Sequence, residues 1–290
     1  MENKAKELLL ELGMASEETI IPFYPRARDR EDIEILRDRK SGVIFLSKTD
    51  HMSVSHYDEI DGGTYWGGKT RDEALKLYHD DDIRRSEQFR SLIEGKDVID
   101  IGCGTGALLD YWKGVAKKVD GVEPQEYIRK ELQALGHTVY HLPQDAPKEQ
   151  YDVATLFHVV EHVIEPLAVL SRVRETLRPG GIVVIEVPHA RDALLQLDSF
   201  KAFSLWSEHL ILHTKESLHA LLERAGFKNI QINGFQRYPL ANHVGWFVDG
   251  KPGGQNRRPE LRVQGAEEAY EKILKESDQT DTLIAIAHND

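Results

Sequence analysis

A short glycine-rich segment that follows an apolar run is the part of this sequence best suited to chemistry. It runs from Asp100 to Gly106 and reads Asp-Ile-Gly-Cys-Gly-Thr-Gly. Its glycines let the backbone adopt positive φ and let a ligand approach closely, while a helix starting near Ala107 directs free N–H groups to the same place. The pattern predicts a strand, a turn and a helix around a nucleotide-type cofactor. The spacing also fits a dinucleotide site, with Ala107 as the third fingerprint residue, so the glycines alone do not identify the cofactor.

Two acidic residues favour S-adenosylmethionine over a dinucleotide. Asp100 ends the predicted strand beside the turn, where its carboxylate would repel the doubly negative pyrophosphate of a dinucleotide. S-adenosylmethionine carries no phosphate, and its ammonium and sulfonium groups suit a neighbouring carboxylate. Glu123 follows the next apolar stretch, 118–122, at the place where an acid can accept hydrogen bonds from both ribose hydroxyls.

At these residues the sequence resembles the class I methyltransferases, whose Asp-x-Gly-x-Gly-x-Gly turn and second-strand acid match 100–106 and Glu123. A Leu-x-Pro-Gly-Gly turn at 177–181 extends the resemblance, which covers about residues 92–188. It implies S-adenosyl-L-methionine as cofactor, S-adenosyl-L-homocysteine as product, and a lid over the cofactor formed by 56–68. The expected cofactor-binding residues, including an adenine-side pair by analogy with related enzymes, are Tyr65, Asp100, Gly102, Cys103, Gly104, Gly106, Glu123, Pro124, Gln144, Asp145, Phe157 and His158.

A segment rich in histidine and glutamate, His158-Val-Val-Glu161-His162, follows the strand predicted at 151–157. Its letters match the inverted zinc-protease motif, but that motif needs one long helix, whereas here an apolar strand precedes it and Pro166 follows closely. The segment also resembles the Glu-x-x-Glu-His of ubiquinone-biosynthesis O-methyltransferases, in which the acids and the histidine can hold magnesium. Because His158 replaces a hard oxygen ligand with a softer nitrogen, magnesium is disfavoured and no metal is expected.

Three histidines are candidate catalytic residues, namely His158, His162 and His209. His158 should lie at the carboxyl edge of the sheet, where open α/β folds bind ligands, and so at the reactive end of the cofactor. His209 precedes a helix predicted at 215–225, in a region similar to the C-terminal part of methyltransferases of sugars and other small metabolites. The histidine in that place lies near their acceptor, so we expect His209 to be the base that takes the acceptor proton. His162 is either part of this set or a hydrogen-bonded core histidine.

Strands and helices alternate regularly after the glycine turn, which implies a parallel sheet with right-handed crossovers. The predicted fold class is α/β, with a doubly wound, mostly parallel seven-stranded sheet of the Rossmann-like, class I methyltransferase type. We assign residues 71–290 to this domain, with an insertion at 238–280 before the last strand at 282–287.

Residues 1–70 are predicted to form an N-terminal arm and the lid. The arm contains an amphipathic helix predicted at 1–14 and a short hairpin at 33–36 and 43–46. The hairpin is similar to a zinc-ribbon knuckle that precedes the catalytic domain in some sugar methyltransferases, but it has no cysteines. We therefore expect a metal-free element that packs on the main domain or on a second subunit.

Composition restricts the partners and the location. The chain has 290 residues and a formal net charge of -12, which disfavours a nucleic-acid substrate. A signal peptide and a membrane-spanning run are not recognised, so a cytoplasmic protein without membrane insertion is expected, with a homodimer as one arrangement.

The predicted function is methyl transfer to a hydroxyl of a small-molecule acceptor. The family resemblance suggests a sugar or nucleotide-linked sugar of surface polysaccharide biosynthesis as that acceptor. The alternatives are an N- or C-methyltransferase that acts on a small metabolite, and a protein that binds S-adenosylmethionine without catalysis.

Overall fold

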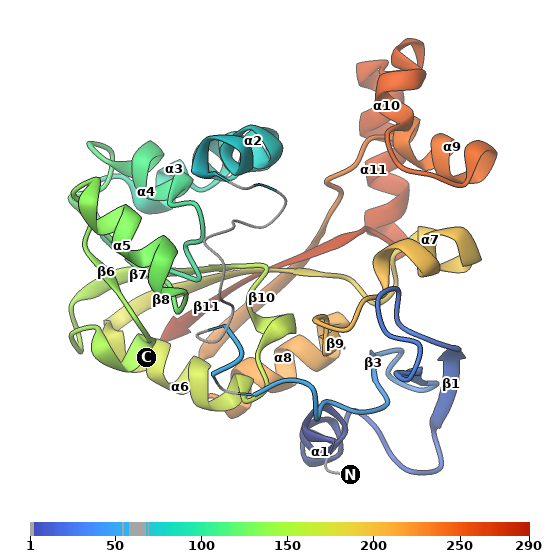
Figure 1. Ribbon diagram of the computed structural model, residues 1–290, viewed down its shortest axis with the longest axis horizontal. Coiled ribbons are helices and arrows are strands. Elements are labelled where there is room, and N and C mark those ends of the chain that lie inside the picture. Colours follow the sequence, from blue (N-terminus) through green and yellow to red (C-terminus); the bar gives the residue numbers. More distant parts are fainter. Residues whose placement is uncertain (1–2, 54, 58–67, 69) are drawn as a thin grey trace.

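A seven-stranded sheet is the centre of the protein in the computed structural model, which describes residues 3–53, 55–57, 68 and 70–290 (Figure 1). The strand order is β10-β11-β8-β7-β4-β5-β6. β11 is antiparallel to both of its neighbours, and the remaining neighbouring pairs are parallel. The strands are β4 (Asp97–Ile101), β5 (Lys118–Val122), β6 (Val139–Tyr140), β7 (Tyr151–Phe157), β8 (Leu177–Pro188), β10 (Lys228–Phe235) and β11 (Thr282–Asn289). The predicted mostly parallel seven-stranded sheet is confirmed.

Strand β4 is buried along its whole length because helices cover both faces of the sheet. Ile99 and Ile101 pack into the core on one face, and Val98 packs into the core on the other. Strands covered on both faces read as continuous apolar runs rather than as alternating patterns, which is why this strand is recognisable in the sequence. Its carboxyl end, with Asp100, lies between β5 and β7 in the middle of the sheet.

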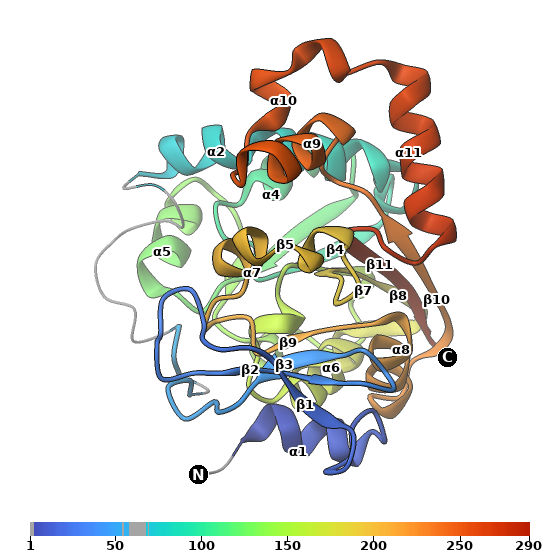
Figure 2. The ribbon, with the colours of Figure 1, turned by 90° about the vertical axis from the view of Figure 1, so that its right-hand side faces the viewer.

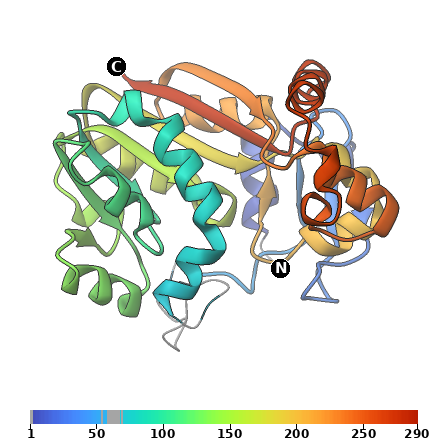
Figure 3. The same cartoon turned by 90° about the horizontal axis from the view of Figure 1, so that it is seen from above.

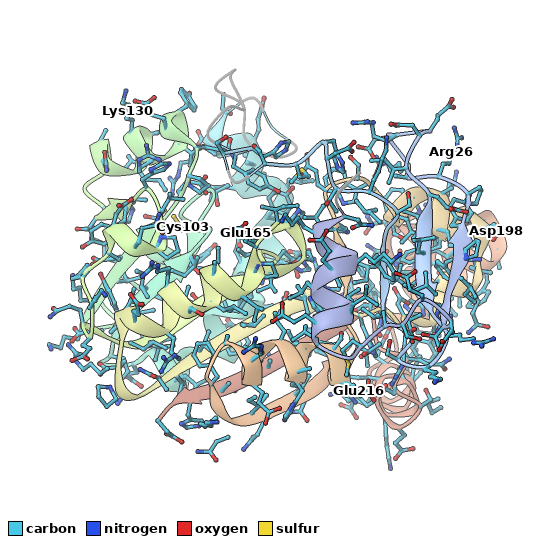
Figure 4. The ribbon with its side chains drawn as sticks, turned by 90° about the horizontal axis from the view of Figure 1, so that it is seen from below. Arg26, Cys103, Lys130, Glu165, Asp198 and Glu216 are labelled. Carbon is cyan, nitrogen blue, oxygen red and sulfur yellow. The ribbon has the colours of Figure 1, made fainter. Side chains whose placement is uncertain are left out.

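The helices form a layer on each side of the sheet (Figures 1 and 3). One layer contains α2 (Arg71–Gln88), α3 (Arg90–Ile93), α4 (Ala107–Trp112) and α5 (Glu126–Ala134). The other contains α6 (Pro166–Thr176) and α8 (Lys215–Arg224), which Figure 4 shows beside α1 (Lys4–Glu11). The doubly wound architecture is therefore confirmed. Thr214 is the N-cap of α8, since its side chain accepts a hydrogen bond from the backbone N–H of Ser217.

A second, four-stranded antiparallel sheet joins the N-terminal arm to the main domain (Figure 2). Its order is β1-β2-β3-β9, and the strands are β1 (Ile20–Tyr24), β2 (Ile35–Asp38), β3 (Ile44–Leu46) and β9 (Ile211–Leu212). The predicted hairpin corresponds to β2 and β3. β9 comes from the C-terminal half of the chain and pairs with β3, so the arm packs on the main domain of its own chain. The sequence does not predict β1 or β9.

The segment expected as an insertion, 238–280, is helical. It contains α9 (Leu240–Asp249), α10 (Gly254–Arg257), the short 3-10 helix η4 (Pro259–Leu261) and α11 (Gln264–Glu276). It packs against α7 (Asp198–Ser204) through an edge-on contact of Phe200 with Trp246 at 5.0 Å. The other 3-10 helices are η1 (Pro143–Asp145), η2 (Val160–His162) and η3 (Ala193–Gln196).

Two boundaries differ from the sequence prediction. Helix α1 spans only residues 4–11 of the predicted 1–14. The turn predicted at 177–181 is the first part of β8, because Leu177 already pairs with Tyr151. After a register shift, the regular pairing starts where Ile182 lies opposite Val153. Among the described helices, none combines the length and the apolar composition that crossing a bilayer requires.

Candidate active site

The glycine turn after β4 has the backbone conformation that its sequence predicts. Gly102 and Gly106 have φ of 70° and 71°. A Cβ at Gly102 would lie 2.7 Å from Val159, and one at Gly106 would lie 2.5 Å from Leu132. Both positions therefore require glycine for conformation and for space. A Cβ at Gly104 would approach only a carbonyl oxygen, at 3.9 Å, so this part of the turn is the most open to a ligand.

Glu123 lies beside the turn, directly after β5, and is buried. Its Oε2 accepts a hydrogen bond from the backbone N–H of Gly104 at 3.0 Å, and its Oε1 accepts one from Gln125 at 2.9 Å. These bonds fix the carboxylate at the carboxyl edge of the sheet. A carboxylate in this position can accept hydrogen bonds from the ribose of a nucleoside.

Asp100 faces a pocket between the glycine turn and helix α2. The pocket is also lined by Asp82, Arg85 and Phe157. Burial raises the pKa of Asp100 to about 7 and that of Asp82 to about 6. Burial disfavours the ionised forms of these two carboxyl groups, and a cation bound beside them would favour the ionised forms again. The ammonium and sulfonium groups of S-adenosylmethionine are such cations.

Helix α2 supplies Asp82 and Arg85, which the sequence analysis did not identify. The helix is held over the sheet by ion pairs of Arg84 and Arg85 with the buried Glu186 of β8, at 2.8 and 2.7 Å. In the described part of the chain, Asp82 Oδ2 is a buried atom without a hydrogen-bond partner. In the sequence, these residues belong to a helix rich in charged residues. Such a composition is common on solvent-exposed helices, so it does not mark a binding site.

Phe157 and Cys103, two other residues expected to bind the cofactor, are both buried near the glycine turn. Phe157, at the end of β7, stacks on Phe89 at 5.3 Å and lines the same pocket as Asp100. The side chain of Cys103 is buried. Its thiol packs against Gly121 of β5 so closely that a Cβ added to Gly121 would lie 2.7 Å from the Cys103 Sγ. A cofactor contact of Cys103 would then use mainly its backbone.

The expected adenine-side residues are more exposed. Gln144 and Asp145 lie in η1, and Asp145 Oδ2 accepts a hydrogen bond from the N–H of Leu142 at 3.0 Å. Pro124 follows Glu123, and its carbonyl accepts a hydrogen bond from Arg129 at 2.8 Å. Tyr65 and most of the expected lid lie outside the described residues.

His158 follows β7 with a φ of 55°, a conformation that turns the chain sharply at the sheet edge. Its Nδ1 is 2.9 Å from Glu161 Oε1, and its Nε2 is 2.9 Å from Arg237 Nη1 and 3.4 Å from Glu186 Oε1. Burial opposes a charged ring, but the two glutamates outweigh it and raise the pKa of His158. Both ring nitrogens are engaged, so this arrangement suits a positioning role better than proton removal.

Glu161, His162 and His209 form a compact cluster on the acceptor side of His158. One candidate ligand atom from each residue lies within 4.8 Å of the other two, and the rings of His162 and His209 are 4.8 Å apart. Glu161 is fully buried, and although burial opposes its charge, its contacts with His158 and His162 hold its carboxyl pKa at about 2. Burial lowers the pKa of His209 to about 3. The cluster therefore combines one carboxylate with neutral imidazole at His209.

The N-terminal arm braces the segment that carries His209. Asp29 accepts hydrogen bonds from the N–H and the hydroxyl of Ser207, at 2.9 and 2.6 Å, and His51 Nε2 donates to the Ser207 carbonyl at 2.8 Å. The N–H of Leu210 donates to the Glu161 carbonyl at 2.8 Å, which ties the segment to η2. Sequence reasoning missed Asp29 and His51 because they lie more than 150 residues from Ser207 along the chain.

Comparison with known proteins identifies the class. The sequence pattern of a family described as a methyltransferase domain matches residues 71–232, which is more than half of the chain. The chain therefore belongs to the methyltransferase domain family, whose cofactor is S-adenosylmethionine. Its glycine turn, Asp100 and Glu123 lie inside the matched region.

Two curated relatives are similar to part of the chain. The tRNA U34 carboxymethyltransferase of Pseudoalteromonas translucida is 30% identical over 155 residues, which cover 48% of this chain and 47% of that protein. A ubiquinone biosynthesis O-methyltransferase of Shewanella pealeana is 25% identical over 147 residues, covering 47% and 62%. The chain thus spans between about half and three fifths of the length of these relatives.

Two solved structures share the fold. A chain in the complex between the Haloferax volcanii Trm112 methyltransferase activator and the putative methyltransferase has a TM-score of 0.53 at 13% identity, with 76% and 93% coverage of the two chains. Phosphoethanolamine N-methyltransferase 2 of Haemonchus contortus, solved with S-adenosyl-L-methionine, has a TM-score of 0.51 at 15% identity, with 84% and 62% coverage.

Proposed function

We propose that this protein transfers the methyl group of S-adenosylmethionine to a hydroxyl group of a small molecule. One observation carries the proposal: His209, from the segment before α8, lies in one cluster with Glu161 and His162, directly beyond the carboxyl end of β7. The cofactor turn after β4 lies beside β7 at the same sheet edge. A donor at the turn and an acceptor at the cluster would thus meet at the position where open α/β sheets bind ligands.

The reaction requires a base on the acceptor side. A lone pair of the acceptor oxygen attacks the methyl carbon, the carbon–sulfur bond breaks, and its electron pair remains on the sulfur of S-adenosylhomocysteine. The hydroxyl proton must leave, and we assign its removal to His209, because both nitrogens of His158 are already engaged. The assigned role of His158 is to hold Glu161 and the reactive end of the cofactor in place.

A sugar or a nucleotide-linked sugar, of the kind used in surface polysaccharide biosynthesis, is the proposed acceptor class. It rests on the similarity of the His209 region to methyltransferases of sugars and small metabolites. The net charge of -12 favours a small acceptor over a nucleic acid, although one relative is named for a tRNA substrate.

Release of S-adenosylhomocysteine tests the proposal. The protein is incubated with S-adenosylmethionine and a panel of nucleotide sugars, small amines and unmodified tRNA, and mass spectrometry locates the added methyl group. We expect turnover with a hydroxyl acceptor and an O-methyl product. Turnover confined to amines or to tRNA would overturn the assignment, and cofactor binding without turnover on an extended panel would favour the non-catalytic alternative.

A further inference from the structure

Arg237, the second residue after β10, joins helix α2 to His158. Its Nε donates to Asp81 Oδ1 on α2 at 3.1 Å, and its Nη2 donates to Oδ2 of the same carboxylate. Its Nη1 lies 2.9 Å from His158 Nε2. Each of the three guanidinium nitrogens therefore has its own partner. The sequence analysis identified neither Arg237 nor Asp81 as a site residue.

The backbone of Arg237 is fixed as well as its side chain. Its N–H contacts both carboxylate oxygens of Asp281, the residue before β11, at 3.0 and 3.1 Å. The N–H of Tyr238 donates to the same carboxylate at 3.0 Å. Although burial opposes the charge of the guanidinium, Asp81 outweighs it and raises the pKa of Arg237. Arg237 is therefore a permanently charged donor that is held in one orientation beside His158.

We propose that Arg237 is a positioning residue for methyl transfer, which fixes the proton of the neutral His158 ring on Nδ1. A guanidinium donates hydrogen bonds and accepts none, so the Nε2 that faces it at 2.9 Å must be the unprotonated nitrogen. The ring proton is then on Nδ1, which donates to Glu161 Oε1 at 2.9 Å. Arg237 thus selects the tautomer in which His158 holds Glu161.

Glu186 is the neighbour that favours the opposite tautomer, because its Oε1 lies 3.4 Å from His158 Nε2. This distance is longer than that of an ordinary hydrogen bond. The carboxylate is occupied from α2 instead, since Arg84 and Arg85 donate to Oε1 at 2.8 and 2.7 Å and Arg84 also donates to Oε2 at 3.0 Å. Helix α2 therefore acts on His158 twice, by neutralising Glu186 and by holding Arg237 through Asp81.

The proposed role requires an arginine and not only a positive charge. A lysine at position 237 has no planar fork and cannot contact Asp81 and His158 at the same time. In Arg237→Lys, the Nε2 of His158 would face mainly the Glu186 carboxylate, which favours a proton on Nε2. Burial lowers the pKa of His158, Glu161 and Glu186 raise it by more, and the charge of Arg237 opposes the two glutamates. Displacement of that charge should therefore also favour the doubly protonated ring.

Nitrogen nuclear magnetic resonance of the full-length protein, labelled in its histidine rings, tests the proposal. The signals missing from His158→Ala identify the ring. At alkaline pH, where the ring is neutral, we expect wild-type His158 to carry its proton on Nδ1 and none on Nε2. Arg237→Lys should move both nitrogen signals toward those of a ring protonated on Nε2.

Calorimetry with S-adenosylhomocysteine measures the consequence for the cofactor, which rests on the proposed function of His158. Arg237→Lys should weaken binding by about threefold to tenfold, the size expected for one hydrogen bond. Because Arg237 acts through His158, the double variant Arg237→Lys/His158→Ala should bind no more weakly than His158→Ala alone. Additive losses in the double variant would show that Arg237 acts independently of His158 and would contradict the proposal.

The matched control is Arg258→Lys, in which the same exchange breaks the same kind of pair. Arg258 donates to both carboxylate oxygens of Asp249 at 2.6 and 2.9 Å, within the segment 238–280. This variant should leave the His158 signals and the cofactor affinity unchanged. If Arg237→Lys does not fold, Asp81→Asn, which removes the charge that holds the guanidinium, takes its place.

A proton on Nε2 of the neutral wild-type ring, or His158 signals that Arg237→Lys and Asp81→Asn both leave unaltered, overturns the proposal. Neither result depends on an acceptor or on turnover. The acceptor panel tests the proposed function separately, so failure of this inference and failure of the proposed function are distinguishable.

Discussion

The cofactor side and the acceptor side of this site are built in different ways. On the cofactor side, Asp100 and Glu123 lie at the ends of adjacent strands, and the turn between them is short and local. On the acceptor side, the segment of His209 is held by Glu161 after β7 and by Asp29 and His51 of the N-terminal arm. The glycine turn, Asp100 and Glu123 come from two adjacent strands, and α2 adds Asp82 and Arg85 to their pocket. The acceptor side depends instead on contacts among segments far apart in the sequence.

Because the cofactor side and the acceptor side are held by different contacts, substitutions in one should leave the other intact. Changes on the cofactor side should weaken the binding of S-adenosylmethionine whatever the acceptor is. Changes on the acceptor side should reduce turnover while cofactor binding persists.

The largest effect is expected for His209→Ala. Because His209 is the proposed base, its loss should lower kcat by about a hundredfold to ten thousandfold, with cofactor affinity unchanged. His158→Ala serves as the comparison. It should weaken cofactor binding as well as turnover, because His158 is expected at the reactive end of the cofactor. Steady-state kinetics with the true acceptor, together with calorimetry, check the pattern. A fall in kcat of less than about tenfold in both variants would mean that both histidines are structural.

Glu123→Ala should weaken binding of S-adenosylhomocysteine by at least about tenfold, because it removes up to two charge-assisted hydrogen bonds to the ribose. The control is Glu126→Ala, which removes an exposed acid at the start of α5 whose partner is Lys130 at 2.6 Å. Calorimetry on the two variants gives the comparison. Equal affinities would show that Glu123 does not contact the cofactor.

Cofactor affinity should depend on pH through Asp100, whose pKa of about 7 is raised by burial. The ionised carboxylate attracts the cationic cofactor, and the protonated form does not. Affinity should therefore be constant above about pH 8 and should fall by up to about tenfold per pH unit below 7 as Asp100 takes up a proton. Asp82, with a pKa of about 6, extends the loss to lower pH. Binding measured from pH 5.5 to 8.5 tests this, and a flat profile for the wild type would contradict it. Asp100→Asn should show a smaller slope.

The smallest effect is expected at the N-cap of α8, in the acceptor half. Thr214→Ala removes the hydrogen bond from Ser217 N–H to the Thr214 hydroxyl and should lower the free energy of unfolding by about 1 kcal/mol. Urea denaturation measures this change. Cofactor affinity should stay the same, and a loss of cofactor affinity would show that the two halves are coupled through α8.

On the cofactor side the sequence predicted the glycine turn and the positions of Asp100 and Glu123 in the fold, because these residues follow local rules. The run at β4, the positive-φ glycines and the acid after β5 all follow from local rules, and the structure places them as predicted. Asp82 and Arg85 were missed because a charged helix that covers a pocket has the same sequence character as a solvated helix.

On the acceptor side the sequence did not predict which distant residues come into contact. His162 and His209 were singled out, yet their contact depends on β9, a two-residue strand too short to leave a pattern. Asp29 and His51 were missed for the same reason, since an isolated acid or histidine in an arm carries no local signal. Long-range contacts of this kind become visible only in the folded chain.

Calorimetric titration of the wild-type protein with S-adenosylhomocysteine and, separately, with NAD tests whether the residues around Asp100 and Glu123 select S-adenosylmethionine without help from the acceptor half. We expect micromolar-scale binding of S-adenosylhomocysteine in the absence of any acceptor, and no detectable binding of NAD. Tight binding of NAD, or binding of S-adenosylhomocysteine only when an acceptor is present, would contradict it.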